Sequence, residues 1–280
     1  MSSYQELVKC LTRLNILDKW TDVTPVENIS GVPIDAGSTS AHENVFEGHD
    51  EEQIRLMEEL CIVLDYEDHP IGAGTKKLCH LMSNINRGLL HRAFSVFLFN
   101  EDGKLMLQQR ADEKITFPNM WTNTCCSHPL CVPSELGIKD NKSNKNELET
   151  AVAGVKLAAQ RKLYHELGIS EQDCPVSSFQ FLTRIHYKSA SGDEASEWGE
   201  HEIDYILILR AKNNIKVEPS LNEVKDFMYV SVDELKVMFE DKNLQFTPWF
   251  KLICETFLFQ WWADLKNIEQ FEDKKIHRLL

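Results

Sequence analysis

Hydrophobic residues recur with two different periods along the chain, and together the two periods predict a mixture of strands and helices. Apolar runs of strand length occupy 60–65, 93–100, 179–187 and 200–210. Asp102-Gly103 predicts a hairpin turn that leads from the second of these strands into another strand over 104–110. Because hairpins and helices are mixed and no internal repeat is present, we expect an α+β layered fold.

Three stretches carry the period and the end signals of helices. Residues 146–167 have a candidate N-cap in Asn146, and Gly168 follows their last residue. A capping-box pattern at 231–234 predicts a short helix, and Thr247-Pro248 begins a long one, because proline is tolerated at the first helical position. Apolar stripes predict the core faces of the first and last helices, formed by Val152, Val155, Ala159 and Leu163, and by Phe250, Ile253, Phe257, Leu258, Trp261 and Leu265.

The N-terminal part differs from the rest of the chain in its pattern and composition. Residues 2–17 show a weak helical pattern, whereas 21–48 are rich in proline, glycine and serine, which favours a linker or a loosely docked tail. We therefore predict an extension over 1–48 and one domain over 49–280, which begins with a short helix near 50–59. A polar, charge-rich stretch at 132–145 predicts an exposed loop.

The formal net charge is −14, and the chain has no long basic run. Nucleic acid is therefore not expected as a partner, and an anionic ligand would need a few local cations to hold it. No apolar run is long enough to predict a membrane span, and no obligate protein partner is indicated. The eight cysteines form no C-x-x-C pair and no signal peptide is seen, which favours a reducing cytoplasm. The final residues do not match the standard peroxisomal tripeptide, so peroxisomal targeting is unsupported but not excluded.

The stretch W-T-N-T-C-C-S-H-P-L, residues 121–130, combines two thiols and an imidazole. Side chains alternate along an extended chain, so Cys126 and His128 would point one way and Cys125 the other. A thiolate is a nucleophile and a base, and an imidazole can bind a metal or move a proton. A buried cysteine pair beside a structural histidine is the alternative reading of this stretch.

A second stretch, W-G-E-H-E-I-D-Y at 198–205, places Glu200 and Glu202 on one face of a strand. Adjacent carboxylates repel each other unless a cation or a shared proton relieves them, although a solvent-facing acidic edge would also tolerate them. Histidines occur at 80 and 91 as well. Three imidazoles and two carboxylates suit a divalent metal of intermediate softness, such as zinc or manganese, provided by His80, His91, His128, Glu200 and Glu202.

The end of the long helix resembles part of the Nudix signature, G-x5-E-x7-R-E-U-x-E-E-x-G-U. The matching positions are Arg161, Leu163, Glu166, Gly168 and Ile169. The opening glycine and three of the glutamates are replaced, by Glu147, Ala153, Lys162 and His165. A hydrolytic site needs several carboxylates to hold metals on a pyrophosphate, so the scaffold is kept while most of the hydrolytic equipment is absent.

Taken together, these stretches resemble the type I isopentenyl-diphosphate isomerases of the Nudix fold, in their eukaryotic form. The resemblance runs from about Gly48 to the end of the chain and also rests on G-A-G-T-K-K, G-L-L-H-R-A-F-S-V-F, Q-Q-R-A-D-E-K-I-T-F-P and F-T-P-W-F-K. It implies an α/β/α layered Nudix-type fold with a mixed sheet, extended by C-terminal helices. It also implies interconversion of isopentenyl and dimethylallyl diphosphate through a tertiary carbocation, a step of isoprenoid and sterol synthesis.

The resemblance assigns roles to residues. Cys126 and Glu202 would face each other across the substrate carbons, with Tyr187 assisting Glu202 and the ring of Trp249 stabilising the cation. The five histidine and glutamate positions would hold one divalent metal, whether zinc, manganese or magnesium, and Glu166 would hold a magnesium carried by the diphosphate. The diphosphate itself would be bound by Lys76, Arg110, Lys114 and Lys162.

Two other functions remain open at this point. A diphosphohydrolase of the same fold would release phosphate, and the replaced glutamates argue against it. A non-catalytic module with Cys126 and His128 in a structural zinc site is the other alternative, although such sites favour paired cysteines at close spacing.

Overall fold

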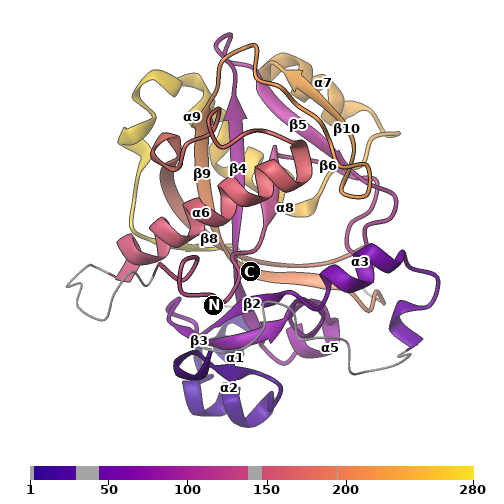
Figure 1. Ribbon diagram of the computed structural model, residues 1–280, viewed down its shortest axis with the longest axis vertical. Helices are drawn as coiled ribbons and strands as arrows, with labels where there is room; N and C mark the ends of the chain where they lie inside the picture. Colours follow the sequence, from indigo (N-terminus) through magenta and orange to yellow (C-terminus); the bar gives the residue numbers. More distant parts are fainter. Residues whose placement is uncertain (1–2, 30–43, 138–146, 194) are drawn as a thin grey trace.

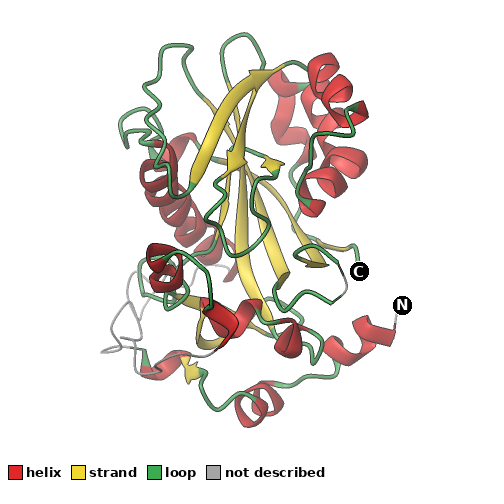
Figure 2. Cartoon of the chain, turned by 90° about the vertical axis from the view of Figure 1, so that its right-hand side faces the viewer, coloured by secondary structure: helices red, strands yellow, loops and turns green. Residues whose placement is uncertain are grey.

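The computed structural model describes residues 3–29, 44–137, 147–193 and 195–280. Its centre is a mixed β-sheet, and Figure 2 shows helices packed on both sides of that sheet. Within the described residues the strands are β1 (Thr24–Pro25), β2 (Leu60–Leu64), β3 (Pro70–Thr75), β4 (Leu90–Phe99), β5 (Leu105–Arg110), β6 (Trp121–Thr122), β7 (Cys125–Ser127), β8 (Gln180–Ala190), β9 (Gly199–Arg210), β10 (Val224–Val230) and β11 (Ile276–Arg278). This mixture of strands and helices confirms the expected α+β class.

The helices lie in three groups that can be followed in Figure 1: short ones beside β2 and β3, one long helix across the sheet, and a C-terminal set on the far side. They are α1 (Ser3–Lys9), α2 (Arg13–Lys19), α3 (Glu51–Leu56), α4 (Lys76–His80), α5 (Met82–Ile85), α6 (Glu147–Leu167), α7 (Val232–Glu240), α8 (Pro248–Ile253) and α9 (Phe259–Ala263). A π-helical stretch, Cys254–Leu258, joins the last two, so the long helix predicted from Pro248 is present with one loosened turn.

The sheet runs in the order β1-β3-β2-β4-β9-β8-β11. Off this path, β5 and β7 pair with β4, and β6 and β10 pair with β5. Strands β4 and β9 pair in parallel over nine residues, from His91 opposite Glu202 to Phe99 opposite Arg210. Every residue of β4 is buried, as a central strand covered on both faces requires. The pairing of these two strands brings their first residues to the same end of the sheet.

Each face of the sheet has its own hydrophobic core. The face under α6 is filled by side chains such as Phe94 and Leu207, together with the predicted stripe residues Val155, Ala159 and Leu163. The opposite face packs against α8 and α9 through Phe97, Ile206 and the stripe that includes Phe250 and Trp261. The predicted apolar faces of both helices are therefore confirmed.

Residues 24–25 lie in the sheet, although the composition of 21–48 favoured a linker or a loose tail. β1 pairs with β3, and Gly72 permits the approach, since a Cβ there would lie 2.3 Å from the carbonyl oxygen of Thr24. Ile16, Trp20 and Val23 are buried in a third, smaller hydrophobic core. The division of the chain at residue 48 stays a prediction.

The loop predicted over 132–145 is present where the structure describes it, at 132–137, and Pro133 and Ser134 are exposed as predicted, but the prediction of exposure is wrong for the two residues that follow. Glu135 is only 6% exposed and Leu136 only 3%. Glu135 accepts hydrogen bonds from the backbone N–H of Leu130 and from the guanidinium of Arg161, at 2.6 Å each, so its charge is satisfied inside the fold. Residues 138–145 and the predicted N-cap Asn146 lie outside the described residues.

The ends of the other helices follow their predicted signals. Ser231 caps α7 through a complete capping box with Glu234, as the sequence predicted. Gly168 follows α6 with a φ of +63°, a left-handed conformation that glycine adopts without cost.

None of the helices that the structure describes is both long enough and apolar enough to cross a membrane.

Candidate active site

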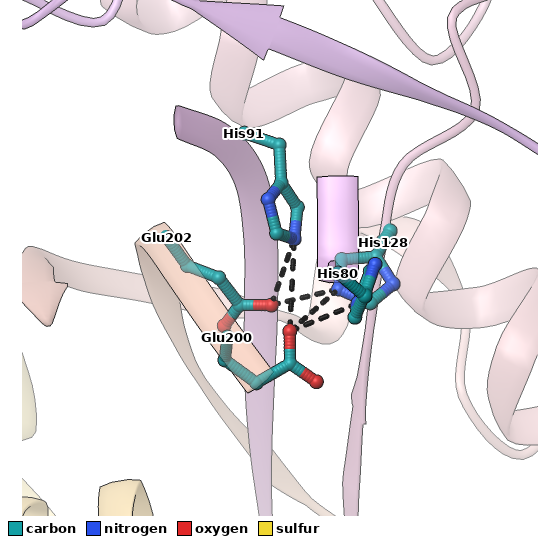
Figure 3. Close-up of side chains that lie close together, drawn as sticks. All are labelled: His80, His91, His128, Glu200 and Glu202. Atoms are coloured by element: carbon teal, nitrogen blue, oxygen red, sulfur yellow. Dashed lines mark hydrogen bonds and ion pairs between the residues drawn. The ribbon is translucent and has the colours of Figure 1, made fainter. Parts of the chain in front are cut away.

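The parallel pairing of β4 and β9 creates the centre of the site. His91, the second residue of β4, lies directly opposite Glu202, and Glu200 lies two residues earlier on the same face of β9. His128 follows the end of β7, and His80 is the last residue of α4. Figure 3 shows the five side chains converging, with the carboxylates of Glu200 and Glu202 facing the three imidazole rings. We call these five residues the His/Glu cluster.

The cluster is compact. His128 Nε2 lies 2.7 Å from Glu202 Oε1, and His91 Nε2 lies 3.2 Å from the same oxygen. His80 Nε2 lies 2.9 Å from Glu200 Oε2. One ligand atom from each of the five residues can be chosen so that all five lie within 4.8 Å of one another. The structure therefore brings together the whole set that the sequence proposed.

Burial decides the protonation of the imidazoles. It lowers the pKa of His80 to about 3 and the pKa of His128 well below its ordinary value, so both rings are neutral near pH 7. The Nδ1–H of His80 donates to the carbonyl oxygen of Lys76 at 2.6 Å, which leaves the Nε2 lone pair directed at the carboxylates. Burial and the nearby Glu202 raise the pKa of Glu200.

The cluster fits a divalent metal ion. Several of its buried atoms have no hydrogen-bond partner, among them Nε2 of His80, Nε2 of His91 and Oε2 of Glu200. Unpartnered buried polar atoms are costly, and a cation would satisfy all three at once. Neutral imidazole nitrogens and carboxylate oxygens are ligands for metals of intermediate softness. The residues present are thus able to hold such an ion.

The cysteine stretch alternates as predicted. Cys126 lines a cavity that also contains His128, whereas Cys125 points to the opposite face and joins the core under α6. The Cys125 thiol lies 3.5 Å from Oε2 of Glu166. Burial raises the pKa of Cys126 to about 12, so this side chain is a protonated thiol at neutral pH. Cys126 is not part of the metal-ligating group found among the described residues, which argues against a structural zinc site made by Cys126 and His128.

Two aromatic residues border the same cavity. The hydroxyl of Tyr187 donates to Oε2 of Glu202 at 2.5 Å, and burial raises the pKa of Tyr187, so the tyrosine keeps its proton. Trp249 is the second residue of α8 and is 3% exposed. Its Nε1–H donates to Oδ1 of Asn123 at 3.2 Å, which fixes the orientation of the indole.

The four predicted anion-binding residues line the same cavity, and they lie close enough to one another for their charges to interact. We call the part of the cavity that these residues line the cation end; the residues are Lys76, Arg110, Lys114 and Lys162. Burial lowers the pKa of Lys114 to about 8, whereas the carboxylates of Glu166 and Glu223 outweigh burial and raise the pKa of Lys162. The overall charge of the chain is negative, yet four cations meet here.

Glu166 lies at the cation end on the last turn of α6. It is 5% exposed, Lys162 lies 3.2 Å from Oε1, and Gln108 donates to Oε2 at 3.1 Å. Lys162 therefore stands beside Glu166 at the position where the hydrolytic signature has a further glutamate. The helix end keeps one carboxylate of the signature in the cavity.

One charged residue of this region escaped the sequence analysis. Glu223 precedes β10, is 4% exposed and accepts a hydrogen bond of 2.7 Å from Nζ of Lys114. Gln53 of α3 donates to its other oxygen at 2.8 Å. The sequence N-E-V-K around it has no apolar run or motif, so only the three-dimensional contacts identify it.

Comparison with known proteins agrees with this geometry. The NUDIX domain family matches residues 89–250. The isopentenyl-diphosphate delta-isomerase of Candida albicans is 69% identical, over 100% of this chain and 99% of that protein. The enzyme of the same name from Schizosaccharomyces pombe is 58% identical, over 82% of this chain and 95% of that protein. Isopentenyl-diphosphate Delta-isomerase 1 of Bos taurus is 51% identical, over 82% and 96%.

The domain match covers β4, β9, α6 and the beginning of α8, which carry most of the site, and confirms the Nudix-type fold. The relatives match over nearly their whole lengths at identities far above those that establish a family. The chain belongs to the isopentenyl-diphosphate delta-isomerase family of NUDIX-domain proteins.

Proposed function

We propose that this chain is an isomerase that interconverts isopentenyl diphosphate and dimethylallyl diphosphate. The observation that carries the proposal is the composition of one cavity. Cys126 and Glu202, which can exchange protons with carbon, share it with four cations that suit a diphosphate and with the buried face of Trp249. The family's name describes the same substrate, and the replaced carboxylates of the signature do not favour a diphosphohydrolase.

The cation end binds and orients the diphosphate. Lysine and arginine side chains attract phosphate oxygens, and their arrangement at one end of the cavity directs the hydrocarbon part toward the other. We infer that Glu166 holds the magnesium ion that accompanies the diphosphate, since a single carboxylate together with phosphate oxygens is a common set of Mg²⁺ ligands. The side chains in these roles are Lys76, Arg110, Lys114, Lys162 and Glu166.

Cys126 and Glu202 transfer the protons. In the forward direction one of them adds a proton to the terminal alkene carbon, the double-bond electrons form that C–H bond, and the adjacent tertiary carbon becomes cationic. The other removes a proton from the methylene beside the diphosphate-bearing carbon, and the electrons of that C–H bond form the new double bond. The two groups exchange roles in the reverse direction, as general acid–base catalysis requires. Tyr187 orients Glu202 through its hydrogen bond to Oε2.

The cation needs a dry pocket and a source of negative potential. Trp249 and Tyr187 are both buried, and their rings border the cavity in place of water. A tryptophan face stabilises a desolvated cation by roughly 2 kcal/mol. This stabilisation acts only along the reaction path, so it raises turnover more than substrate affinity.

The His/Glu cluster would hold a divalent ion, and we propose zinc, manganese or magnesium on the strength of its nitrogen and oxygen ligands. When bound, that ion supplies positive charge beside Glu202 and favours the ionised form of this carboxylate. His80, His91 and His128 would orient it, and Glu200 would share it with Glu202.

For the cellular site we propose the cytoplasm. The cysteines that the structure describes are all free thiols, which supports a reducing compartment.

Incubation with isopentenyl diphosphate and magnesium in heavy water tests the proposed function. We expect dimethylallyl diphosphate that carries solvent deuterium, with no release of phosphate. Phosphate release from isopentenyl diphosphate or from nucleoside diphosphate compounds, without isomer formation, would instead identify a diphosphohydrolase.

A further inference from the structure

A strained turn lies against the site. Phe117 is fully buried and has a φ of +49°, in the left-handed region that bulky side chains rarely adopt. Asn119, two residues later, also has a positive φ, but asparagine tolerates this conformation well. Phe117 is followed by proline, which restricts its backbone further. Such strain persists only where the surrounding structure holds it in place.

Two polar side chains hold this turn. The guanidinium of Arg110 donates through Nε to the carbonyl oxygen of Phe117 at 3.0 Å, and through Nη2 to the carbonyl oxygen of Thr116 at 2.8 Å. The backbone N–H of Phe117 donates to Oγ of Ser191 at 2.7 Å. Ser191 belongs to the connection between β8 and β9, the strands that carry Tyr187 and Glu202. Both peptide groups of Phe117 are therefore bound by side chains from other parts of the fold.

The phenyl ring of Phe117 meets Trp249 edge to face. The ring centroids are 5.0 Å apart at an interplanar angle of 86°, a favourable geometry for two aromatic rings. The Arg110 guanidinium also lies over the indole, 5.9 Å from its centroid. Arg110 lines the cavity as well, so one side chain touches the turn, the indole and the space for the diphosphate.

We propose that Phe117 is a positioning residue for Trp249, held in its strained conformation by Arg110 and Ser191; this inference rests on the function proposed above. The ring of Phe117 fixes the angle that the indole presents to the developing cation. Because Arg110 binds both the turn and the substrate's charged group, occupation of the cation end also tightens the contact at Trp249. The orientation of the indole is therefore fixed when a diphosphate is bound.

A double-mutant cycle tests the coupling between the two rings. Phe117→Leu keeps most of the bulk but removes the edge-to-face contact, and we expect kcat to fall about tenfold with little change in KM. In a Trp249→Leu background the same substitution should lower kcat less than about twofold, because the group it positions is already absent. Equal factors in the two backgrounds would show that Phe117 is only a packing residue and would overturn the inference.

The backbone anchor gives an independent variant in case Phe117→Leu folds poorly. Ser191→Ala leaves the N–H of Phe117 without its acceptor, so kcat should fall while Ser191→Thr, which retains a hydroxyl, should restore it. Asn119→Gly is the matched control in the same turn, and it should leave kcat unchanged because the side chain of Asn119 bonds to Gln109 and Lys225, neither of which lines the cavity. Full activity of Ser191→Ala would contradict the proposed anchoring. A wild-type protein that does not isomerise isopentenyl diphosphate would refute the proposed function instead, which keeps the two failures distinct.

Discussion

The cation end and the His/Glu cluster differ in whether their polar side chains have partners within the protein. At the cation end three of the four side chains already have partners: Lys114 is paired with Glu223 at 2.7 Å, Lys162 lies 3.2 Å from Glu166, and Arg110 is bonded to backbone carbonyls. In the His/Glu cluster, buried atoms such as His80 Nε2 and Glu200 Oε2 have no hydrogen-bond partner. Most of the cation end is paired within the protein, whereas an added positive charge would satisfy the unpartnered atoms of the cluster.

Because of this difference, substitutions in the cation end and in the His/Glu cluster should have different effects on binding. A diphosphate entering the cation end exchanges one set of ionic partners for another, so single substitutions there should alter affinity by modest factors. The cluster instead gathers three imidazoles around two carboxylates, and removal of one ligand would weaken the binding of an ion that all five residues share. The two proposed proton-transferring groups, Cys126 and the cluster member Glu202, line the same cavity, and turnover should depend on both.

The largest effect on turnover is expected for Cys126, one of the two proposed proton-transferring residues. Cys126→Ala should leave the protein folded but lower turnover by at least about 100-fold, because it removes a proton-transfer group. Cys125→Ala is the matched neighbour, with its thiol on the opposite face beside Glu166, and it should cost far less. Turnover and circular dichroism of the two variants provide the measurement. Equal losses would show that the position of Cys126 in the cavity is not what matters.

A smaller but still large effect should separate the two proposed metal sites. His128→Ala removes one ligand of the cluster, and elemental analysis should show metal content falling from about one ion per chain. Glu166→Gln should leave that content unchanged and should instead weaken the dependence of turnover on added magnesium. Full metal occupancy in His128→Ala, or a loss of tightly bound metal in Glu166→Gln, would contradict the division into two ends.

The sequence predicted those features that depend on local patterns. The alternation of Cys125, Cys126 and His128, the capping box at Ser231 and the apolar stripes of α6 and α8 all follow from spacing along one element, and each is confirmed. The ligand chemistry of three imidazoles and two carboxylates selected the members of the cluster, and the resemblance to a known family implied the same set. The convergence of His80 and His91 on β9 could not be read from the spacing, because it depends on how four separate elements pack.

The features that the sequence missed depend on long-range contacts. The glycine-rich strand β3 was not among the predicted strands, and its Gly72 lets the backbone of Thr24 approach, so that residues 24–25 join the sheet. Glu135 and Glu223 look like surface charges, and both are buried because a cation from a distant element meets them. The strain at Phe117 is equally invisible in sequence, since the groups that hold it come from β5 and from the end of β8.

The smallest expected effect concerns the pH response of the cation end. Burial lowers the pKa of Lys114 to about 8, so its ammonium group is charged at neutral pH and loses its proton as the pH rises further. Only the charged form attracts the diphosphate, so kcat/KM should decline above pH 8. The decline should reach about tenfold, since one charge-assisted hydrogen bond contributes roughly 1.5 kcal/mol.

Two variants locate the alkaline limb of this pH profile. Lys114→Arg keeps its charge at all accessible pH values and should remove the decline. Glu223→Gln deletes the carboxylate that raises the pKa of Lys114, so the decline should begin at a lower pH than in the wild type. The cluster has no part in this response, and its metal content should stay constant in both variants. A limb that stays in place in both would show that Lys114 is not the titrating group, and that the charge of the cation end is held by its other members.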